Sequence, residues 1–298
     1  MASGKYALIT GVASGGMGEG HMKALLSRGI SVIATSIDLK LLEYLDATSH
    51  GDDAEVFKLE LDVTSKESIA ATVERVKEIT GGKLDFLLNN AGYGYYMPLL
   101  DVDLEKARKQ YEVNVWGVLA LTQAFFPLLR VAKGTIINQS SMAGVQGFNR
   151  PYMGIYSSSK AAVYSLSDYM RVELAPFDIK VLTLVTGAVK TEFYTNIKEG
   201  GKPITLPPDS PYNPIRKHIE TMMNGSLAGM KGHDRLQVTR STIATALRYS
   251  WLSTRYVRRG FGALKIWLMQ LLLPVWLVDR WARQAGSLDK LKQMLASG

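Results

Sequence analysis

The sequence predicts an α/β fold of the doubly wound class, in which helices cover both faces of a parallel sheet. Over about the first 190 residues, short apolar runs of strand length alternate with stretches of helical spacing, which is typical of parallel strands joined by helices. The runs are almost continuously hydrophobic, as expected for strands buried on both sides. We expect strands at residues 6–10, 31–35, 56–61, 84–88, 135–138 and 180–184.

Composition narrows the function classes. The chain has 298 residues and a formal net charge of +8, so an anionic partner such as a nucleotide phosphate or a membrane surface is expected. Nucleic acid is not expected, because the basic residues form no single block and no nucleic-acid motif is present. The chain has no cysteine and only four histidines, which are scattered, so we predict no metal site. The first residues lack a signal-peptide pattern, which predicts a cytoplasmic protein.

The pattern predicts one main domain and a C-terminal extension. We expect residues 1–255 to form a dinucleotide-binding and catalytic domain. Within it, an insertion at about 192–241 is apolar and is expected to act as a lid over a hydrophobic substrate. The extension, residues 256–298, contains thirteen mostly apolar residues at 266–278, too few to span a bilayer as a helix. Arginines and tryptophans flank this segment, as in interfacial membrane anchors. A helix packed against the domain or a dimer partner would look the same, so both interpretations stay open.

A glycine-rich stretch, TGVASGGMGEG, follows the first predicted strand and opens the first helix. The absence of side chains at Gly11, Gly16 and Gly18 lets the backbone turn tightly and lets a pyrophosphate approach main-chain N–H groups. The helix N-terminus adds partial positive charge at the same point. Alone, such a loop is equally consistent with a flexible turn, and the dinucleotide hypothesis depends on the motifs that follow.

Four motifs support the hypothesis in sequence order. Asn89-Asn90-Ala91-Gly92 follows the fourth strand, Asn114 lies on the next helix, and Ser140-Ser141 ends the fifth strand. Tyr156 and Lys160 then lie four residues apart, which places them on one helix face about 6 Å apart. A nearby ammonium favours the phenolate and lowers the pKa of a tyrosine toward neutrality. This pair therefore suits proton transfer to an alkoxide that forms as a carbonyl accepts a hydride.

With these motifs the chain resembles the classical short-chain dehydrogenase/reductase superfamily, over roughly residues 5–192. The segments GKLDFLLNNAG and IYSSSKAAVYSLSDYMRVELAPFDIKV, with Thr186-Gly187 where most members carry Pro-Gly, resemble fungal 1-acyldihydroxyacetone-phosphate reductases within it. The resemblance implies a Rossmann-type fold, a nicotinamide cofactor and a homo-oligomer. It also implies a cytoplasmic protein that associates peripherally with the endoplasmic reticulum or lipid droplets.

The resemblance implies a role for each catalytic residue. Tyr156 would be the acid/base, Lys160 would lower its pKa and hold the nicotinamide ribose, and Ser141 would hydrogen-bond the substrate oxygen. Asn114 would hold a water in the proton relay, and Ser140 would be structural. The spacing from Ser141 to Tyr156 is two residues longer than usual, and Asn149-Arg150 resembles the insertion. It lies in the loop that rims the substrate pocket, where it is expected to alter substrate choice.

Cofactor contacts follow from the same resemblance. NADPH is favoured over NADH, although Ile37 stands where an arginine usually pairs the 2′-phosphate. Asp38 would bind ribose hydroxyls or simply start the next helix, Asp62 would cap the adenine, and Val189 and Thr191 would contact the carboxamide. The full set of expected cofactor contacts is Gly11, Ser14, Gly16, Met17, Gly18, Ser36, Asp38, Asp62, Asn90, Tyr156, Lys160, Val189 and Thr191.

The expected activity is an NAD(P)H-dependent interconversion of a ketone and a secondary alcohol on a small hydrophobic substrate. Acyl-dihydroxyacetone phosphate is the leading candidate, and a polyketide or terpenoid of fungal secondary metabolism is the alternative. A protein of another class, which senses dinucleotides without turnover, would keep the glycine loop but has no need of the Ser141, Tyr156 and Lys160 set.

Overall fold

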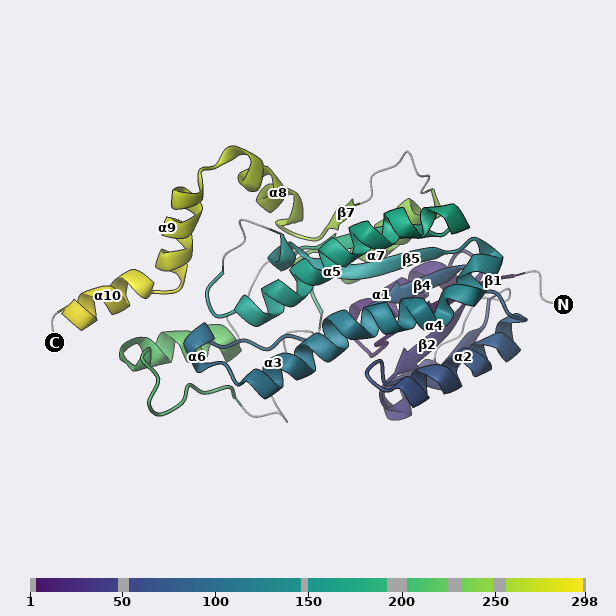
Figure 1. The fold of residues 1–298 in the computed structure, drawn as a ribbon, viewed down its shortest axis with the longest axis horizontal. Helices are drawn as coiled ribbons and strands as arrows, with labels where there is room; N and C mark the ends of the chain where they lie inside the picture. The colour runs from purple at the N-terminus through teal and green to yellow at the C-terminus, as the bar shows by residue number, and fades with distance from the viewer. Residues whose placement is uncertain are drawn as a thin grey trace.

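The computed structural model describes residues 4–47, 54–145, 150–191, 203–224, 232–248 and 256–296. Its centre is a seven-stranded parallel sheet with the order β3-β2-β1-β4-β5-β6-β7 (Figure 1). This architecture confirms the predicted doubly wound fold. The strands are β1 (Lys5–Ile9), β2 (Ile30–Ser36), β3 (Val56–Glu60), β4 (Phe86–Asn89), β5 (Thr135–Ser141), β6 (Lys180–Thr186) and β7 (Tyr256–Arg259).

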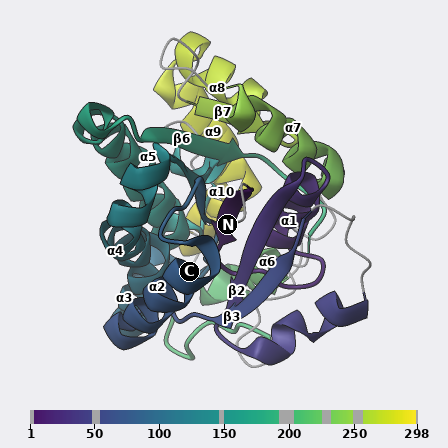
Figure 2. The same ribbon diagram turned by 90° about the vertical axis from the view of Figure 1, so that its right-hand side faces the viewer.

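Helices cover both faces of the sheet, which explains the near-continuous hydrophobicity of the strands. Every residue of β2 is buried, for example. One face packs against α2, α4 and α5, and the other packs against α1 and α7, so the sheet lies between two helical layers (Figure 2). The helices are α1 (Met17–Leu26), α2 (Lys66–Thr80), α3 (Leu104–Tyr111), α4 (Gly117–Ala132), α5 (Gly154–Glu173), α6 (Arg216–Asn224), α7 (Arg235–Leu247), α8 (Ala263–Leu272), α9 (Val275–Ala285) and α10 (Leu288–Ala296).

Local sequence sets the helix ends. At the start of α2 the hydroxyl of Ser65 accepts a hydrogen bond from the amide of Ser68, and Gly81 ends the helix in the left-handed conformation with φ 66°. Asp103 caps α3 and Asp234 caps α7 in the same way as Ser65. These side chains satisfy amides in the first turn of each helix and thereby favour its start at that residue.

The strand order reverses between β1 and β4, which lie side by side at the centre of the sheet. In open α/β sheets, ligands bind in the crevice outside the carboxyl ends of the strands at this switch point. The glycine-rich loop follows β1 and the Asn-Asn-Ala-Gly motif follows β4. The topology therefore brings the two motifs to one crevice.

The sheet extends beyond the boundary expected from the sequence. Strand β7 pairs with β6 and continues the sheet to Arg259, so the first residues expected in the C-terminal extension belong to the sheet. Its sequence, Tyr-Val-Arg-Arg, is short and carries charge, which explains why its strand character was not apparent. The apolar segment 266–278 is also not one helix. It is divided between α8 and α9 at Leu273 and Pro274, because proline disfavours helical geometry in the residue before it.

One long helical run, residues 104–132, is apolar and long enough to cross a membrane by length and composition alone. Leu121, Phe125 and Leu128 of this run are buried in the core against the sheet. Its hydrophobicity is therefore that of a core helix.

Candidate active site

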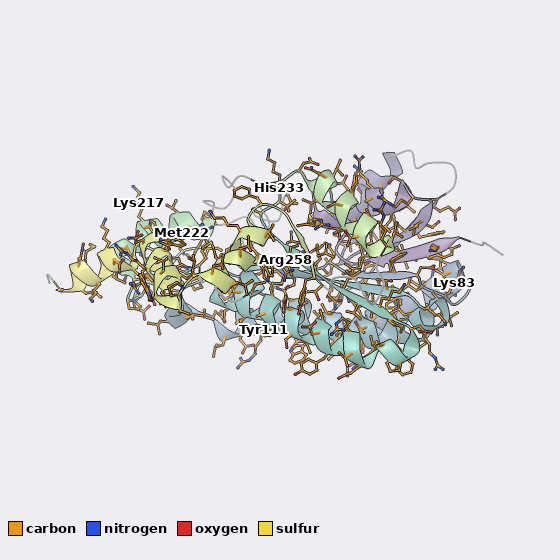
Figure 3. The ribbon with its side chains drawn as sticks, turned by 90° about the horizontal axis from the view of Figure 1, so that it is seen from above. Lys83, Tyr111, Lys217, Met222, His233 and Arg258 are labelled. Carbon is orange, nitrogen blue, oxygen red and sulfur yellow. The ribbon has the colours of Figure 1, made fainter. Side chains whose placement is uncertain are left out.

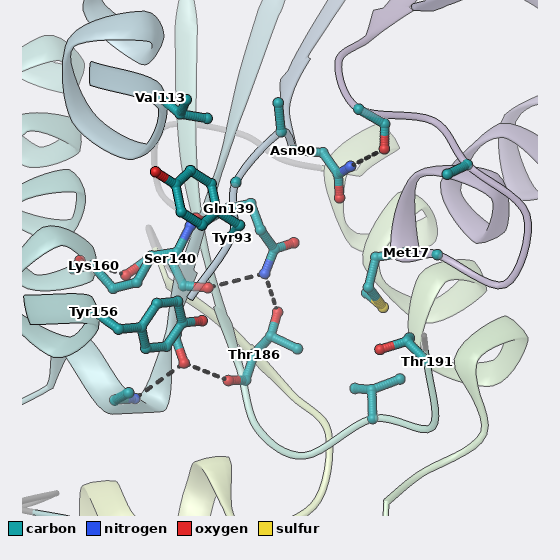
Figure 4. Close-up of a pocket in the computed structure, with 18 of the residues that line it drawn as sticks. Met17, Asn90, Tyr93, Val113, Gln139, Ser140, Tyr156, Lys160, Thr186 and Thr191 are labelled. Carbon is teal, nitrogen blue, oxygen red and sulfur yellow. Dashed lines mark hydrogen bonds between the residues drawn. The ribbon is translucent and has the colours of Figure 1, made fainter. Parts of the chain in front are cut away.

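A cleft of about 460 Å³ opens at the carboxyl ends of the strands. In Figure 4, Met17 and Asn90 lie on one side of this cleft, and Tyr156 and Lys160 lie on the other. It is lined by most of the residues expected to bind the cofactor or substrate: Gly11, Ser14, Gly16, Met17, Ser36, Asp62, Asn90, Ser141, Tyr156, Lys160, Val189 and Thr191. Gly18, Asp38 and Asn114 are not among its lining residues.

The glycine loop is shaped by contacts that exclude side chains. Gly11 has φ +68°, and a Cβ there would lie 2.8 Å from the Cα of Ala91. A Cβ on Gly18 would lie 2.9 Å from the carbonyl oxygen of Gly11, so Gly18 permits the helix to pack on the loop although it does not line the cleft. The Asn90 amide donates to the carbonyl oxygens of Thr10 and Gly11 at 2.8 and 3.1 Å. Asn90 thereby fixes the loop against the end of β4.

Tyr156 and Lys160 project from the first two turns of α5 and are buried, with 7% and 4% of their surface exposed. The Lys160 Nζ lies 6.0 Å from the centre of the Tyr156 ring and donates a hydrogen bond to the carbonyl oxygen of Gln139 at 2.9 Å. Burial lowers the pKa of Lys160 from 10.5 to about 8. The Tyr156 ring also makes an edge contact with Tyr96, with 5.8 Å between ring centres.

The two serines at the end of β5 have different environments. The Ser140 hydroxyl donates to the carbonyl oxygen of Lys160 at 2.8 Å and is almost fully buried, so it ties β5 to α5. The Ser141 hydroxyl lines the cleft, accepts from the amide of Ala143 at 3.1 Å and lies 3.5 Å from the Thr186 carbonyl oxygen. Of the pair, Ser141 is better placed to meet a substrate.

Asn114 lies behind the cleft wall in a single π-helical turn, Glu112–Trp116, between α3 and α4. Its amide nitrogen donates to the Tyr93 carbonyl oxygen at 3.0 Å and to the Ser159 hydroxyl at 3.1 Å. A Cβ on Gly92 would lie 2.9 Å from the Asn114 Oδ1 and 3.2 Å from the Lys160 Nζ, so Asn114 approaches Lys160 across a glycine. Such π-helical turns often occur at functional sites. The water-holding role of Asn114 stays a prediction.

The part of the cleft lined by Ser36, Ile37 and Asp62 contains both polar and apolar side chains. Ser36 is buried at the end of β2, whereas the next residue, Ile37, is 64% exposed. The Asp38 carboxylate accepts a hydrogen bond from the amide of Lys40 and is exposed, which fits the start of the following 3₁₀ helix, Leu39–Ala47. Asp62 lines the cleft, and its carboxylate accepts from the amide and the hydroxyl of Thr64 at 2.9 and 2.7 Å.

Sequence reasoning missed three residues near the cleft. Glu19 and Arg235 form a partly buried ion pair beside the glycine loop, and Gln139 lines the cleft and bonds to Ser140 and Thr186. Glu19 lies at the third position of α1, where a carboxylate can accept a hydrogen bond from an amide that the helix leaves unpaired. This position could have indicated from the sequence that Glu19 contacts the glycine loop. No local pattern links Glu19 to Arg235, because they are far apart in the sequence.

Some residues of the predicted lid lie outside the described residues, namely Phe193, Tyr194, Ile197, Leu227 and Met230. Asn149, in the loop expected to rim the pocket, also lies outside them. Met222 and Met223 of the described part lie on α6, where Met223 packs into a cluster with Tyr96, Tyr152 and Tyr156. Figure 3 shows α6, with Lys217 and Met222 labelled, beside the C-terminal helices, and His218 contacts the carbonyl oxygen of Ala285 at 3.1 Å.

The fold and the cleft define a dinucleotide-binding oxidoreductase of the Rossmann type. A family model described as short chain dehydrogenase matches residues 5–202. The chain belongs to the short-chain dehydrogenase family and is an NAD(P)-dependent oxidoreductase, as predicted.

Relatives and solved structures agree with this family. The chain is 42% identical over 221 residues to a short-chain dehydrogenase of Penicillium crustosum, covering 74% of this chain and 76% of the relative. It is 34% identical over 219 residues to an NADPH-dependent 1-acyldihydroxyacetone phosphate reductase of Schizosaccharomyces pombe, covering 74% and 71%. A short-chain dehydrogenase structure from Streptomyces avermitilis matches with TM-score 0.74 and 27% identity over 98% of both chains. A Burkholderia cenocepacia structure in complex with NADP matches with TM-score 0.69 and 28% identity over 93% of this chain and 97% of that one.

Proposed function

We propose that the protein interconverts a ketone and a secondary alcohol on a hydrophobic substrate with NADPH as the preferred cofactor. The observation that carries the proposal is the single cleft that joins the glycine loop to Ser141, Tyr156 and Lys160. The loop fits a dinucleotide, because the missing Cβ at Gly11 and Gly18 lets the loop close tightly and lets α1 pack on it, so that α1 begins at the cleft. A bound cofactor would supply or accept the hydride.

The chain's own residues would handle the oxygen and the proton. Ser141 would donate a hydrogen bond to the substrate oxygen and hold it beside Tyr156. The Tyr156 hydroxyl would give its proton to that oxygen as the alcohol forms, and it would take the proton back in the reverse direction. The Lys160 ammonium would stabilise the phenolate that remains. Burial of this pair excludes water that would weaken the interaction.

The NADPH preference is supported by the relative from S. pombe, which is named as NADPH-dependent. In this chain the Ser36 hydroxyl, at the end of β2, would donate to the 2′-phosphate in place of the missing arginine. The test is a direct measurement of the dissociation constants of NADPH and NADH by fluorescence titration. Equal or tighter binding of NADH would overturn the preference.

The substrate we favour is an acylated dihydroxyacetone phosphate. Tyr93, Tyr96, Met142 and Met153 give the cleft an apolar lining suited to an acyl chain, and Arg150 lines the same cleft. A guanidinium is well suited to bind a substrate phosphate. A neutral polyketide or terpenoid ketone would use the apolar lining but would have no need of Arg150.

The two candidates are separated by one set of assays. NADPH oxidation is followed by absorbance with acyl-dihydroxyacetone phosphate beside polycyclic ketones. An Arg150→Gln variant is then expected to raise the KM for the phosphorylated substrate about tenfold, the size expected for one charged hydrogen bond. The same variant would leave the KM for neutral ketones unchanged. Turnover of polycyclic ketones alone would favour the alternative.

We further propose that the C-terminal helices associate with a membrane surface, as a cytoplasmic protein bound peripherally to the endoplasmic reticulum or to lipid droplets. Leu271, Leu272, Val275 and Trp276 are between 63% and 74% exposed at the junction of α8 and α9. Exposed apolar residues of this kind suit the headgroup region of a bilayer. A Leu272→Ser and Trp276→Ser double variant should lose co-flotation with liposomes. The matched double variant Leu104→Ser and Val131→Ser, which changes residues of similar exposure elsewhere, should retain it.

A homo-oligomer is also proposed. Trp116, on the turn before α4, and Tyr169 and Val172, on α5, are large apolar residues, and each is at least half exposed. Exposed large apolar residues are typical of protein interfaces where they form a patch. Sedimentation velocity of the full chain would test it, and a monomer at micromolar concentration would contradict it.

A further inference from the structure

A short segment, residues 232–235, joins two walls of the cofactor cleft and is called the strap below. At its first end the strap runs along the wall that ends in Val189 and Thr191. The amide of His233 donates to the Ala188 carbonyl oxygen at 3.2 Å, and the amide of Lys190 donates to the His233 carbonyl oxygen at 3.1 Å. Figure 3 marks His233 at this position beside the start of α7.

At this end the backbone of the strap lies so close to the backbone of Val189 and Lys190 that only a glycine fits. A Cβ on Gly232 would lie 2.9 Å from the Lys190 amide nitrogen and 2.9 Å from the carbonyl carbon of Val189. Those atoms are backbone and cannot move aside like the end of a side chain. The strap is therefore fixed in position against this wall.

At its other end the strap holds the glycine loop through Arg235. The Arg235 Nη1 donates to the Gly16 carbonyl oxygen at 3.2 Å and to the Glu19 Oε2 at 2.5 Å. The same Glu19 oxygen accepts the amide of Gly15 at 2.9 Å, and Gly15 has φ +75°. Glu19 thus fixes the loop at Gly15, and Arg235 fixes Glu19.

Glu19 carries a negative charge that must be balanced by the neighbouring cations Arg235 and Lys23. The Glu19 side chain is 7% exposed and the Arg235 side chain 19% exposed, and Lys23 contacts the other Glu19 oxygen at 2.5 Å. Burial acts to raise the pKa of Glu19, but hydrogen bonds from Lys23, the Gly15 amide and Arg235 outweigh it and lower the pKa. Glu19 is therefore an anion beside a loop that would receive anionic phosphates. Without the cations it would repel them.

We propose that Glu19 and Arg235 are positioning residues for the cofactor, and that the strap fixes the glycine loop relative to the wall containing Val189. The proposal rests on the dinucleotide binding in this cleft. A cofactor that spans both walls would then bind with its pyrophosphate and nicotinamide sites already at the correct separation. Preorganisation of this kind strengthens binding because fewer groups must be ordered at the moment of association.

The test compares a whole cofactor with a fragment that touches only one wall. NADPH and adenosine 2′-monophosphate, which lacks the pyrophosphate and the nicotinamide, are titrated against the full chain and its Arg235→Met variant. We expect NADPH binding to weaken about ten- to hundredfold, the range for the loss of a hydrogen bond between charged groups. Fragment binding should change less than threefold. Arg235→Lys, which keeps the charge but loses the planar fork, should recover part of the loss.

Two further variants separate positioning from simple stability. Arg216→Met is the matched control, because Arg216 Nη1 likewise donates to a carbonyl oxygen, that of Leu206, and to a carboxylate, that of Glu220. It should leave NADPH binding unchanged. Gly232→Ala alters the other end of the strap and leaves the ion pair in place. It should also weaken the binding of NADPH more than the binding of adenosine 2′-monophosphate.

Three results would overturn the proposal. Unchanged NADPH affinity in Arg235→Met would show that the strap does not position the cofactor. Equal weakening of NADPH and the fragment, with a parallel fall in Tm, would show that Arg235 only stabilises the packing of α7 on α1. A wild-type chain that binds neither NADPH nor NADH would overturn the cofactor assignment as well.

Discussion

The ammonium of Lys160 donates to the carbonyl oxygen of Gln139 at 2.9 Å, and only 4% of the surface of Lys160 is exposed. This hydrogen bond fixes the position of the amine on α5 relative to the end of β5. This hydrogen bond uses one of the three N–H donors of the ammonium, so the other two could bind the cofactor or a group beside the substrate. The cost of burying the charge is visible in the lowered pKa of Lys160.

The first prediction concerns stability against pH. The pKa of Lys160 is about 8 in the folded protein and 10.5 as its ordinary value, so between these pH values the unfolded state binds more protons. The free energy of unfolding should therefore rise with pH across this window, by about 3 kcal/mol at most. The measurement is chemical denaturation from pH 7 to 10.5 for wild type and Lys160→Met. If the difference in free energy of unfolding between wild type and Lys160→Met does not change with pH, the prediction is wrong.

The second prediction concerns the Tyr156 hydroxyl. A Tyr156→Phe variant keeps the ring contact with Tyr96 and removes only the proton donor, so kcat should fall by about 10²–10⁴. Cofactor affinity should change little, since the glycine loop and Lys160 remain. Absorbance assays and fluorescence titration measure the two effects separately. Full retention of kcat would remove Tyr156 from the mechanism.

The third prediction uses the adjacent serines as a matched pair. Ser141→Ala should lower kcat/KM about tenfold or more, because its hydroxyl is expected to hold the substrate oxygen. Ser140→Ala should instead lower the free energy of unfolding by about 1–2 kcal/mol, because it leaves the carbonyl oxygen of Lys160 without its buried donor. Reversed effects would mean that Ser140 is the residue facing the substrate.

Much of this site could be predicted from the sequence because its motifs are local. A loop without side chains after the first strand, and a tyrosine and lysine four residues apart on a helix, each carry a geometric consequence. The strap could not be predicted, since the pairing of Glu19 with Arg235 depends on how α7 packs on α1. Strand β7 was missed for a similar reason: four partly charged residues become a strand only because the edge of β6 is available to pair with them.

The fourth prediction concerns cofactor choice at the end of β2. Ile37 lines the cleft and is 64% exposed, so an arginine can be accommodated there without disturbing the core. Ile37→Arg should tighten NADPH binding about tenfold through a charged hydrogen bond to the 2′-phosphate and leave NADH binding unchanged. Paired fluorescence titrations measure both constants, with Ile37→Gln as the uncharged control. If Ile37→Arg tightens the binding of NADPH and NADH equally, the 2′-phosphate does not bind beside residue 37.

The last prediction concerns Tyr152, which links the C-terminal helices to the loop before α5. Tyr152 is buried with φ +71°, and its hydroxyl donates to the carbonyl oxygen of Gly286 at 2.5 Å. Burial also raises the pKa of this hydroxyl to about 12, so it stays a donor at neutral pH. Tyr152→Phe leaves the Gly286 carbonyl without this donor and should lower the free energy of unfolding by about 1–3 kcal/mol.

Tyr152 shares a hydrophobic cluster with Tyr156 and with Leu291 of α10. The Tyr152→Phe variant should therefore also increase protease cleavage within α9 and α10, measured by limited proteolysis. Tyr212→Phe is the control, since the Tyr212 ring also contacts Tyr152 but lies just before the short 3₁₀ helix Asn213–Ile215, outside the C-terminal helices. Cleavage that rises equally in both variants would show general loosening of the cluster. Cleavage that rises only in Tyr152→Phe would mean that the hydrogen bond to Gly286 holds the C-terminal helices against the cluster that contains Tyr156, the tyrosine expected to donate the proton.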